Sequence, residues 1–322
     1  MKFRTEIDIT PWGYPITYDN NIVTLGSCFA DAIAERLCNY KFKVSASPTG
    51  ILFNPESIAF MVELMSEGYT IKDEDIIERD GSYYSYLFHS SITGNSHDEA
   101  KANMQLALDQ GAEALRHANH IIITLGTAWR YRHIETNRIV ANCHKQPAAN
   151  FSRELMSVEN ICAALESIVN ATSAKITLTV SPVRHIGEGM EDNSLSKALL
   201  RVATDIVCKR HSERVNYFPS YEILIDDLRD YRFYGNDLVH PSEMAVDYIA
   251  EKFFEAALSS DTKQKMTRVE KIVQAANHRP MNPRSEKYHS FCQAQLRAIE
   301  KIHGVDLSKE KRFFEQMLQI NL

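Results

Sequence analysis

The fold of this chain is constrained most by a strand that turns directly into a helix between residues 22 and 34. Residues 22–25 (Ile-Val-Thr-Leu) predict a buried strand that ends at Gly26-Ser27, and a helix with apolar spacing follows at once. This places the Ser27 hydroxyl at the carboxyl end of a sheet, above the free N–H groups and the positive end of a helix dipole. Such a position suits a nucleophile whose reaction forms an oxyanion, and it equally suits a serine that only caps the helix.

The rest of the chain alternates strands with helices. Further strands are predicted near residues 42–44, 120–125, 175–180 and 215–218. Helices are predicted at about 27–40, 55–65, 98–118, 157–171, 194–211 and 243–259, with a β-hairpin at 128–141 and short strands near 83–88. This alternation predicts an α/β protein with a mostly parallel sheet of about five strands, covered by helices on both faces.

The character of the sequence changes near residue 261, where the chain becomes charged and helical in pattern. We therefore predict an α/β domain over residues 1–260 and a C-terminal helical appendage over residues 261–322. The simplest role of this appendage is to pack against the domain, and a lid or an oligomer contact is the alternative.

Composition narrows the class of protein. The 322 residues are 44% hydrophobic and 24% charged, as in an ordinary soluble protein, and the net charge of -6 argues against a nucleic-acid partner. No apolar run is long enough to cross a membrane, and no secretory signal is visible at the start. Six cysteines without CxxC spacing indicate reduced thiols, so we expect a cytoplasmic enzyme or binding protein.

Because ligands bind at the carboxyl ends of strands in such sheets, the residues that follow each predicted strand are the candidate site. These residues are Ser27, Gly50, Asn54, Gly126, Thr127, the segment 181–185 that includes His185, and the segment 234–241. The last segment contains Asp237 and His240, three residues apart in a polar loop before a helix. At that spacing a carboxylate can orient an imidazole and stabilise its cation, as a serine nucleophile requires of its base. A turn-capping aspartate beside a surface histidine is the simpler alternative.

Several segments carry a resemblance to a known family. Residues 26–30, Gly-Ser-Cys-Phe-Ala, spell the signature of the GSCFA family, a branch of the SGNH/GDSL-like hydrolases. Segments 50–55, 125–129, 142–145, 180–185 and 231–240 also resemble the family, and the resemblance covers about residues 3–256. It implies a flavodoxin-like, three-layer α/β/α SGNH-hydrolase fold.

The resemblance also implies roles for individual residues. Ser27 is the expected nucleophile, His240 the general base and then acid, and Asp237 the carboxylate that orients it. The backbone N–H groups of Ser27 and Gly50 are the expected oxyanion donors.

The chain departs from the pattern at one position. SGNH enzymes offer an asparagine in a GxND motif as a third oxyanion donor, and here Ala128 stands in its place. Loss of such a donor costs about 3 kcal/mol of transition-state stabilisation. The candidate substitutes are Asn142, His144, His185 and Arg184, each of which could instead satisfy backbone groups.

Other chemistries find less support. Cys28 could be a thiolate at the helix N-terminus, but adjacent side chains point in different directions, so only Ser27 or Cys28 can face the site. The histidines at 89, 97, 144, 185 and 240 lack HxxxH spacing, so no metal is expected. The glycines form neither GxGxxG nor a P-loop, so no nucleotide cofactor is expected.

The sequence thus predicts a serine ester hydrolase that acts through an acyl-Ser27 intermediate, without a cofactor. Its expected partner is a small-molecule or carbohydrate acyl ester, with an O-acetyl group on carbohydrate suggested by family analogy alone, and no nucleic acid or membrane. Two alternatives remain: a weakly catalytic or non-catalytic binding protein that keeps the fold, and an acyltransferase that uses the same triad.

Overall fold

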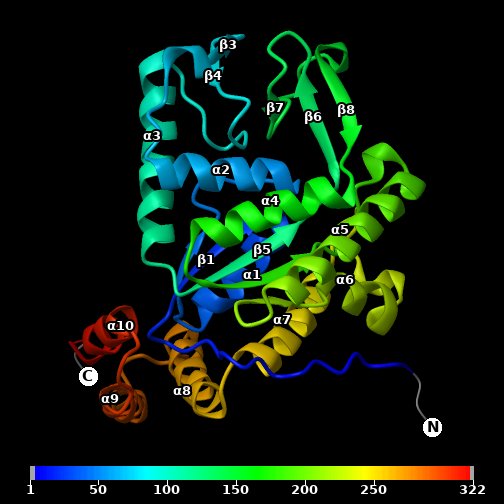
Figure 1. Ribbon diagram of the computed structural model, residues 1–322. Helices are drawn as coiled ribbons and strands as arrows, with labels where there is room; N and C mark the ends of the chain where they lie inside the picture. The colour runs from blue at the N-terminus through cyan, green and yellow to red at the C-terminus, as the bar shows by residue number, and fades with distance from the viewer. Residues whose placement is uncertain (1–3, 320–322) are drawn as a thin grey trace.

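A five-stranded, wholly parallel sheet lies at the centre of the computed structural model, which describes residues 4–319 (Figure 1). Its strands are β1 (Asn21–Gly26), β2 (Lys43–Ala46), β5 (His120–Leu125), β9 (Lys175–Val180) and β10 (Val215–Tyr217). They lie in the order β10-β9-β5-β1-β2. Counted along the chain, this is the flavodoxin-like order 2-1-3-4-5, and the direction of winding reverses between β1 and β5.

Apolar side chains alternate between the two faces of the sheet and build two separate cores. Val23 and Ile121 belong to one apolar cluster, whereas Ile22 and Ile122, their neighbours in sequence, belong to the other. The helices that contribute to the first cluster are α2 (Pro55–Glu67), α3 (His97–Arg116), α4 (Val158–Ala171) and α5 (Met190–Arg210). The second cluster is covered by α1 (Cys28–Asn39) and α7 (Glu243–Ala257). The predicted three-layer α/β/α fold is therefore confirmed.

A small lobe lies beyond α2 and α4, at the top of Figure 1. It contains β3 (Ile77–Arg79), β4 (Ser82–Tyr84), β6 (Trp129–His133), β7 (Ile139–Val140) and β8 (Phe151–Leu155). The antiparallel pair β6–β7 is the predicted hairpin, but β8, which pairs with the other side of β6, was not predicted. Only Phe151 in β8 is buried, so its sequence lacks the apolar alternation that marks a strand.

Short helical turns complete the connections of the chain. They are the turns Asp73–Asp75, Ala148–Asn150, Ile186–Glu188 and Tyr231–Phe233, the single turn α6 (Ser220–Glu222) and a π-helical turn at Ile223–Leu228. No helix in the described part of the chain is both long and apolar enough to span a bilayer.

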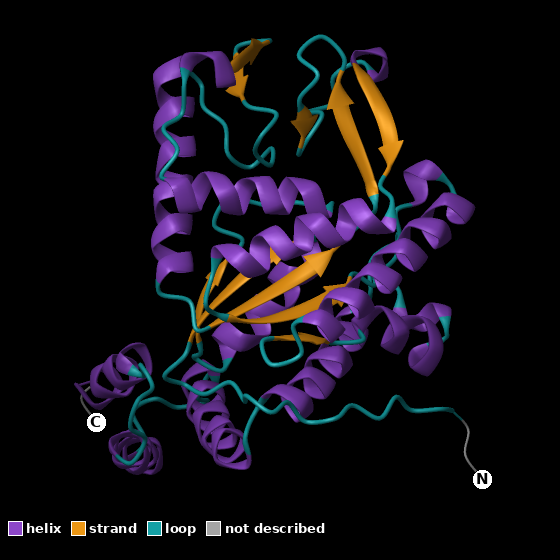
Figure 2. Cartoon of the chain, viewed as in Figure 1, coloured by secondary structure: helices purple, strands orange, loops and turns teal. Residues whose placement is uncertain are grey.

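The C-terminal segment is helical, as predicted, and packs beside α1 and α7 (Figure 2). It consists of α8 (Ser260–Asn277), α9 (Glu286–Glu300) and α10 (Ser308–Gln319). Apolar residues such as Ile272 and Phe314 belong to the same cluster as Phe29 of α1. An ion pair between Lys41 and the buried Glu310, 2.6 Å long, joins α10 to the loop after α1. The appendage is thus anchored by both apolar packing and charge.

Gly26, the last residue of β1, permits an unusually close approach of two strands. Its φ is +120°, and a Cβ at this position would lie 2.1 Å from the carbonyl oxygen of Thr124 on β5. The absence of a side chain lets the Ser27 N–H donate to that same oxygen at 2.9 Å. Gly26 therefore fixes where Ser27 leaves the sheet.

We expect Gly26→Ala to lower the free energy of unfolding by about 3 kcal/mol or more, because the new methyl group meets backbone and the φ is strained. Urea denaturation measures this loss. Gly13→Ala is the matched control, since nothing lies within 4 Å of a Cβ there, and it should change stability by less than about 0.5 kcal/mol. Equal effects of the two substitutions would contradict this account.

Candidate functional site

The loop that follows β2 draws together the ends of β1 and β5, where the winding of the sheet reverses. Leu52 N–H donates to the Gly26 carbonyl at 2.8 Å. Phe53 accepts through its carbonyl from the N–H groups of Gly126 and Thr127, at 2.8 and 3.0 Å. Ligands of flavodoxin-like folds bind at this reversal point, so Ser27 and Gly126 occupy the expected position of a site.

Ser27 lies at the N-cap position of α1 but does not cap it. Its side chain makes no capping hydrogen bond, the residue is 1% exposed, and its Oγ is buried without a hydrogen-bond partner. Buried hydroxyl groups are usually paired, so the Ser27 Oγ is free to bond a partner, as are the Oγ1 atoms of Thr24 and Thr124 on β1 and β5. The capping explanation of Ser27 therefore finds no support in the side-chain geometry.

Asp237 and His240 form the hydrogen-bonded pair that their spacing predicts. Asp237 Oδ2 lies 2.7 Å from His240 Nδ1, and Asp237 Oδ1 accepts from the N–H groups of Val239 and His240 at 3.0 Å each. These backbone bonds, together with the imidazole, lower the pKa of Asp237 to about 2. Because a carboxylate only accepts, Nδ1 carries the hydrogen and the lone pair of neutral His240 lies on Nε2. This is the tautomer of a general base.

A tight hairpin holds this pair beside the end of β9. The Gly235 N–H donates to the His240 carbonyl at 2.8 Å, and Tyr234 and Pro241 form an isolated antiparallel β-bridge. Arg184, just after β9, donates from its backbone to the Val239 carbonyl at 3.2 Å. The side chains of Asp237 and His240 are half exposed, whereas Ser27 is buried. Ser27 and His240 are thus not hydrogen-bonded to each other in this structure.

His185 extends the site from β9 toward Gly126. Its Nε2 is buried without a hydrogen-bond partner and lies 3.2 Å from where a Gly126 Cβ would be. The ring packs edge-on against Phe53, with 5.6 Å between ring centroids. Burial, the charge of Lys197 and that of His240 lower the pKa of His185 to about 4, so the imidazole is neutral at pH 7.

The two backbone donors expected for an oxyanion are both engaged. The Ser27 N–H donates to Thr124, and the Gly50 N–H donates to the Ser47 carbonyl at 2.7 Å. Gly50 has a φ of +81°, and a Cβ there would lie 2.6 Å from the Cβ of His89. Gly50 therefore serves the close packing of this loop, and neither N–H points to a vacant acceptor position.

Two other strand-end candidates have structural roles. Asn54 caps α2, accepting from the Ser57 N–H at 2.9 Å and donating to the Ser57 hydroxyl at 3.0 Å. Thr127 Oγ1 lies 3.1 Å from the Ser196 hydroxyl and accepts from the Trp129 N–H at 3.1 Å. Their polar atoms are thus committed to local structure.

The structure does not bring Asn142 and His144 to the strand ends. Asn142 accepts from the His144 N–H at 2.8 Å. His144 Nε2 lies 2.8 Å from the Ser85 carbonyl and 3.1 Å from the Phe88 carbonyl, so it must donate to them. Burial lowers the pKa of His144. These hydrogen bonds of the two residues lie within the small lobe.

The structure also bears on a thiolate at Cys28 and on a metal site. Burial raises the pKa of the Cys28 thiol, the opposite of what a reactive thiolate needs. The six cysteines are free, and the described residues contain no group of three or more metal-ligating side chains. The geometry therefore favours Ser27 over its neighbour.

Lys197 is the residue of this region that sequence reasoning missed. It lies on α5, is 1% exposed, and donates from Nζ to the carbonyls of Gly126 and Ser181 at 2.6 and 2.8 Å. The sequence does contain a signal, because Lys197 falls in a helical stripe with Leu200 and Thr204, all of them buried. A lysine in a buried stripe needs a polar partner.

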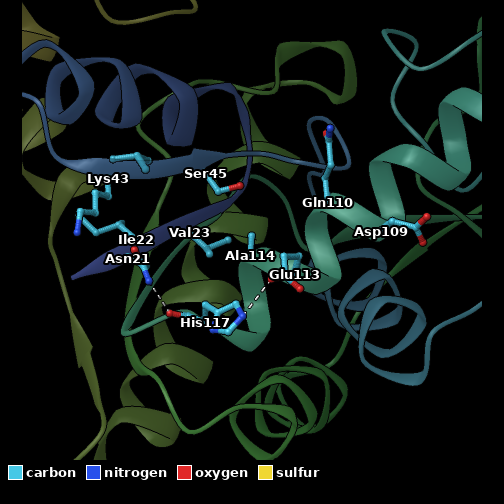
Figure 3. A pocket seen from close by; sticks show the side chains of 11 residues that line it. Asn21, Ile22, Val23, Lys43, Ser45, Asp109, Gln110, Glu113, Ala114 and His117 are labelled. Atoms are coloured by element: carbon cyan, nitrogen blue, oxygen red, sulfur yellow. Dashed lines mark hydrogen bonds and ion pairs between the residues drawn. The ribbon is translucent and has the colours of Figure 1, made fainter. Parts of the chain in front are cut away.

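Two large surface pockets lie away from the candidate site residues. A pocket of about 730 Å³ lies against Asn21, Ile22 and Lys43, at the amino ends of β1 and β2, opposite the end that carries Ser27 (Figure 3). Another, of about 900 Å³, lies between α2, α4 and the small lobe. Neither is lined by any of the candidate site residues.

The fold and the site together define a flavodoxin-like α/β protein with a serine, a histidine–aspartate pair and a buried lysine around one edge of its sheet. Comparison with protein families makes the assignment specific. The profile of the GSCFA family matches residues 21–253, and that of the GSCFA domain protein, C-terminal domain, matches residues 269–320. The chain therefore belongs to the GSCFA family. A comparison with curated proteins finds no match.

If Asn54 acts as a helix cap, Asn54→Ala should lower the free energy of unfolding by about 1 kcal/mol, whereas Asn54→Ser, which can still cap, should lower it less. Thermal and urea unfolding measure both variants. Asn54→Ala with unchanged stability would show that the cap is not what this residue provides.

The lowered pKa of His185 predicts a pH dependence of stability. Below about pH 6.5 the unfolded chain binds a proton at this position, while the folded chain does so only near pH 4. The stabilisation is thus complete above pH 6.5 and is lost as the pH falls through that window. We expect urea midpoints measured between pH 7 and pH 4 to fall less steeply for His185→Gln than for the wild type. Parallel curves would contradict a neutral, buried His185.

Proposed function

We propose that this protein is a serine ester hydrolase in which Ser27 is the nucleophile and His240, oriented by Asp237, is the general base. The observation that carries the proposal is the 2.7 Å hydrogen bond between Asp237 and His240, which leaves the basic nitrogen Nε2 facing away from the carboxylate. The buried, unpaired Ser27 hydroxyl at the reversal point of the sheet supports it.

The reaction begins when His240 Nε2 takes the hydroxyl proton and Ser27 Oγ bonds to the ester carbonyl carbon. The tetrahedral intermediate then collapses, and the C–O bond to the alcohol breaks as His240 returns the proton to the leaving oxygen. Water, deprotonated by His240, attacks the acyl-Ser27 ester, and the carboxylic acid leaves while the proton returns to Ser27. The approach of His240 to the covered hydroxyl accompanies substrate binding, since the two are unbonded in the free chain.

We assign the third oxyanion donor, in place of the asparagine missing at Ala128, to His185. Its Nε2 is buried, unpaired and beside Gly126, and its pKa of about 4 keeps the ring neutral at pH 7. A neutral imidazole with its hydrogen on Nε2 can donate to an oxyanion without a competing proton transfer. The N-terminus of α1 adds positive potential at the same edge.

The substrate class we propose is a short-chain acyl ester, with an O-acetyl group on a carbohydrate as the first to test. A nucleophile that is 1% exposed has little room beside it for a long acyl chain. The six free cysteines support a reducing compartment, and we propose the cytoplasm.

A non-catalytic binding protein is the second candidate, and a specific observation favours it. The N–H groups of Ser27 and Gly50, which would complete an oxyanion hole, are both hydrogen-bonded to carbonyls. An acyltransferase would use the same residues with an alcohol in place of water, and added alcohol acceptors would then raise the rate.

We expect the wild type to hydrolyse p-nitrophenyl acetate faster than the octanoate, and to be labelled by a fluorophosphonate at Ser27. Ser27→Ala and His240→Ala should reduce hydrolysis to the background rate, and the double variant should lose no more, because the two residues act as a unit. Asp237→Asn should lower kcat by roughly 10²–10⁴-fold.

His117→Ala is the matched control, since this exposed histidine pairs only locally with Glu113, and it should retain full activity. Absence of both labelling and hydrolysis above the Ser27→Ala level, in a folded wild type, would reject the hydrolase in favour of the binding protein.

A further inference from the structure

Lys197 is a charged residue buried at the edge of the sheet that carries Ser27. Its Nζ bridges two carbonyls that belong to different strand ends, Gly126 after β5 and Ser181 after β9. An ammonium group that is 1% exposed is costly to desolvate, so it needs well-made polar contacts. The Tyr221 ring, whose centroid lies 5.9 Å from Nζ, adds to these two hydrogen bonds.

The two carbonyls that Lys197 bonds belong to segments next to His185, the proposed oxyanion donor. Gly126 is the residue against which His185 Nε2 lies, at 3.2 Å from the position of a Cβ. Ser181 begins the short segment that carries His185, and the His185 N–H is itself held by Asn193 of α5 at 2.9 Å. Lys197 and Asn193 are four residues apart, so one face of α5 bonds both the backbone of His185 and the two strand ends beside it.

We propose that Lys197 is a positioning residue of this site: its Nζ joins the ends of β5 and β9 and so holds His185 beside Gly126. The proposal rests on the proposed function, because it assigns Lys197 a task in binding the carbonyl oxygen of an ester. Lys197 acts through His185 and forms no bond to the substrate.

The electrostatic part of this task follows from which charges face His185. Lys197 of α5 and His240 of the 234–241 hairpin are the two groups whose charges disfavour its protonation, in addition to burial. Burial is the largest of the three causes, and the charge of Lys197 comes before that of His240. Protonated His185 would repel the His240 cation that forms in the reaction, so a neutral ring serves both the oxyanion and the base.

The test compares Lys197→Met, Lys197→Arg and the control Lys209→Met, which removes an exposed lysine of the same helix that pairs with Asp205. The readouts are kcat and KM for p-nitrophenyl acetate, and the NMR titration of the His185 ring, assigned by its loss in His185→Gln. We expect Lys197→Met to lower kcat by about 10²-fold with KM little changed, and to raise the pKa of His185 by about 1 unit. Lys197→Arg should keep that pKa low, and Lys209→Met should match the wild type.

An unchanged His185 titration in folded Lys197→Met overturns the proposal, whatever happens to kcat. If near-UV circular dichroism shows that Lys197→Met does not fold, Lys197→Arg decides: a His185 pKa as low as in the wild type supports the proposal, and a raised one overturns it. A wild type without esterase activity rejects the proposed function, while the titration still shows whether Lys197 sets the charge of His185.

Discussion

The close approach of β1 to β5 at Gly26 is the contact on which the arrangement of the strand ends depends. Without a Cβ, the chain can turn away from the sheet at a φ of +120° while Ser27 still donates to Thr124 at 2.9 Å. This hydrogen bond extends the pairing of β1 with β5 by one residue beyond Gly26. Ser27 therefore leaves the sheet at the point where the strand order reverses. The loop after β2 then closes over the same place through Leu52, whose N–H donates to the Gly26 carbonyl.

The two histidines at this edge of the sheet, His185 and His240, differ in burial and in the charge beside them. His240 is half exposed and bonded to a carboxylate, whose own pKa falls to about 2 in return. His185 is covered and lies near the ammonium group of Lys197, which helps to lower its pKa to about 4. The two rings therefore differ in their surroundings, with a carboxylate bonded to one and a buried, positively charged side chain near the other.

The parts of the structure that could be predicted from sequence are those set by local pattern. The three central strands, β1, β5 and β9, are largely apolar runs, so their positions follow from the sequence. The Asp237–His240 bond lies within a single hairpin, so three residues of spacing suffice to foresee it. The parts that could not be predicted depend on contacts between distant segments. His144 follows a strand of the hairpin, yet carbonyls from Ser85 and Phe88 hold it in the small lobe. Lysine is usually a surface residue, and the two carbonyls that Lys197 Nζ bonds come from distant segments, so its burial could not be foreseen.

The loop between β2 and α2 has a mechanical consequence. It is tied to β1 through Leu52 and to the turn after β5 through Phe53, so it can lift only by breaking several backbone bonds at once. The hairpin that carries His240 is tied to the end of β9 by two 3.2 Å hydrogen bonds from Arg184, one from its backbone to Val239 and one from its guanidinium to Leu238, and the His240 side chain is half exposed. In the proposed reaction we therefore expect the half-exposed hairpin, and not the loop after β2, to move when His240 approaches the Ser27 hydroxyl.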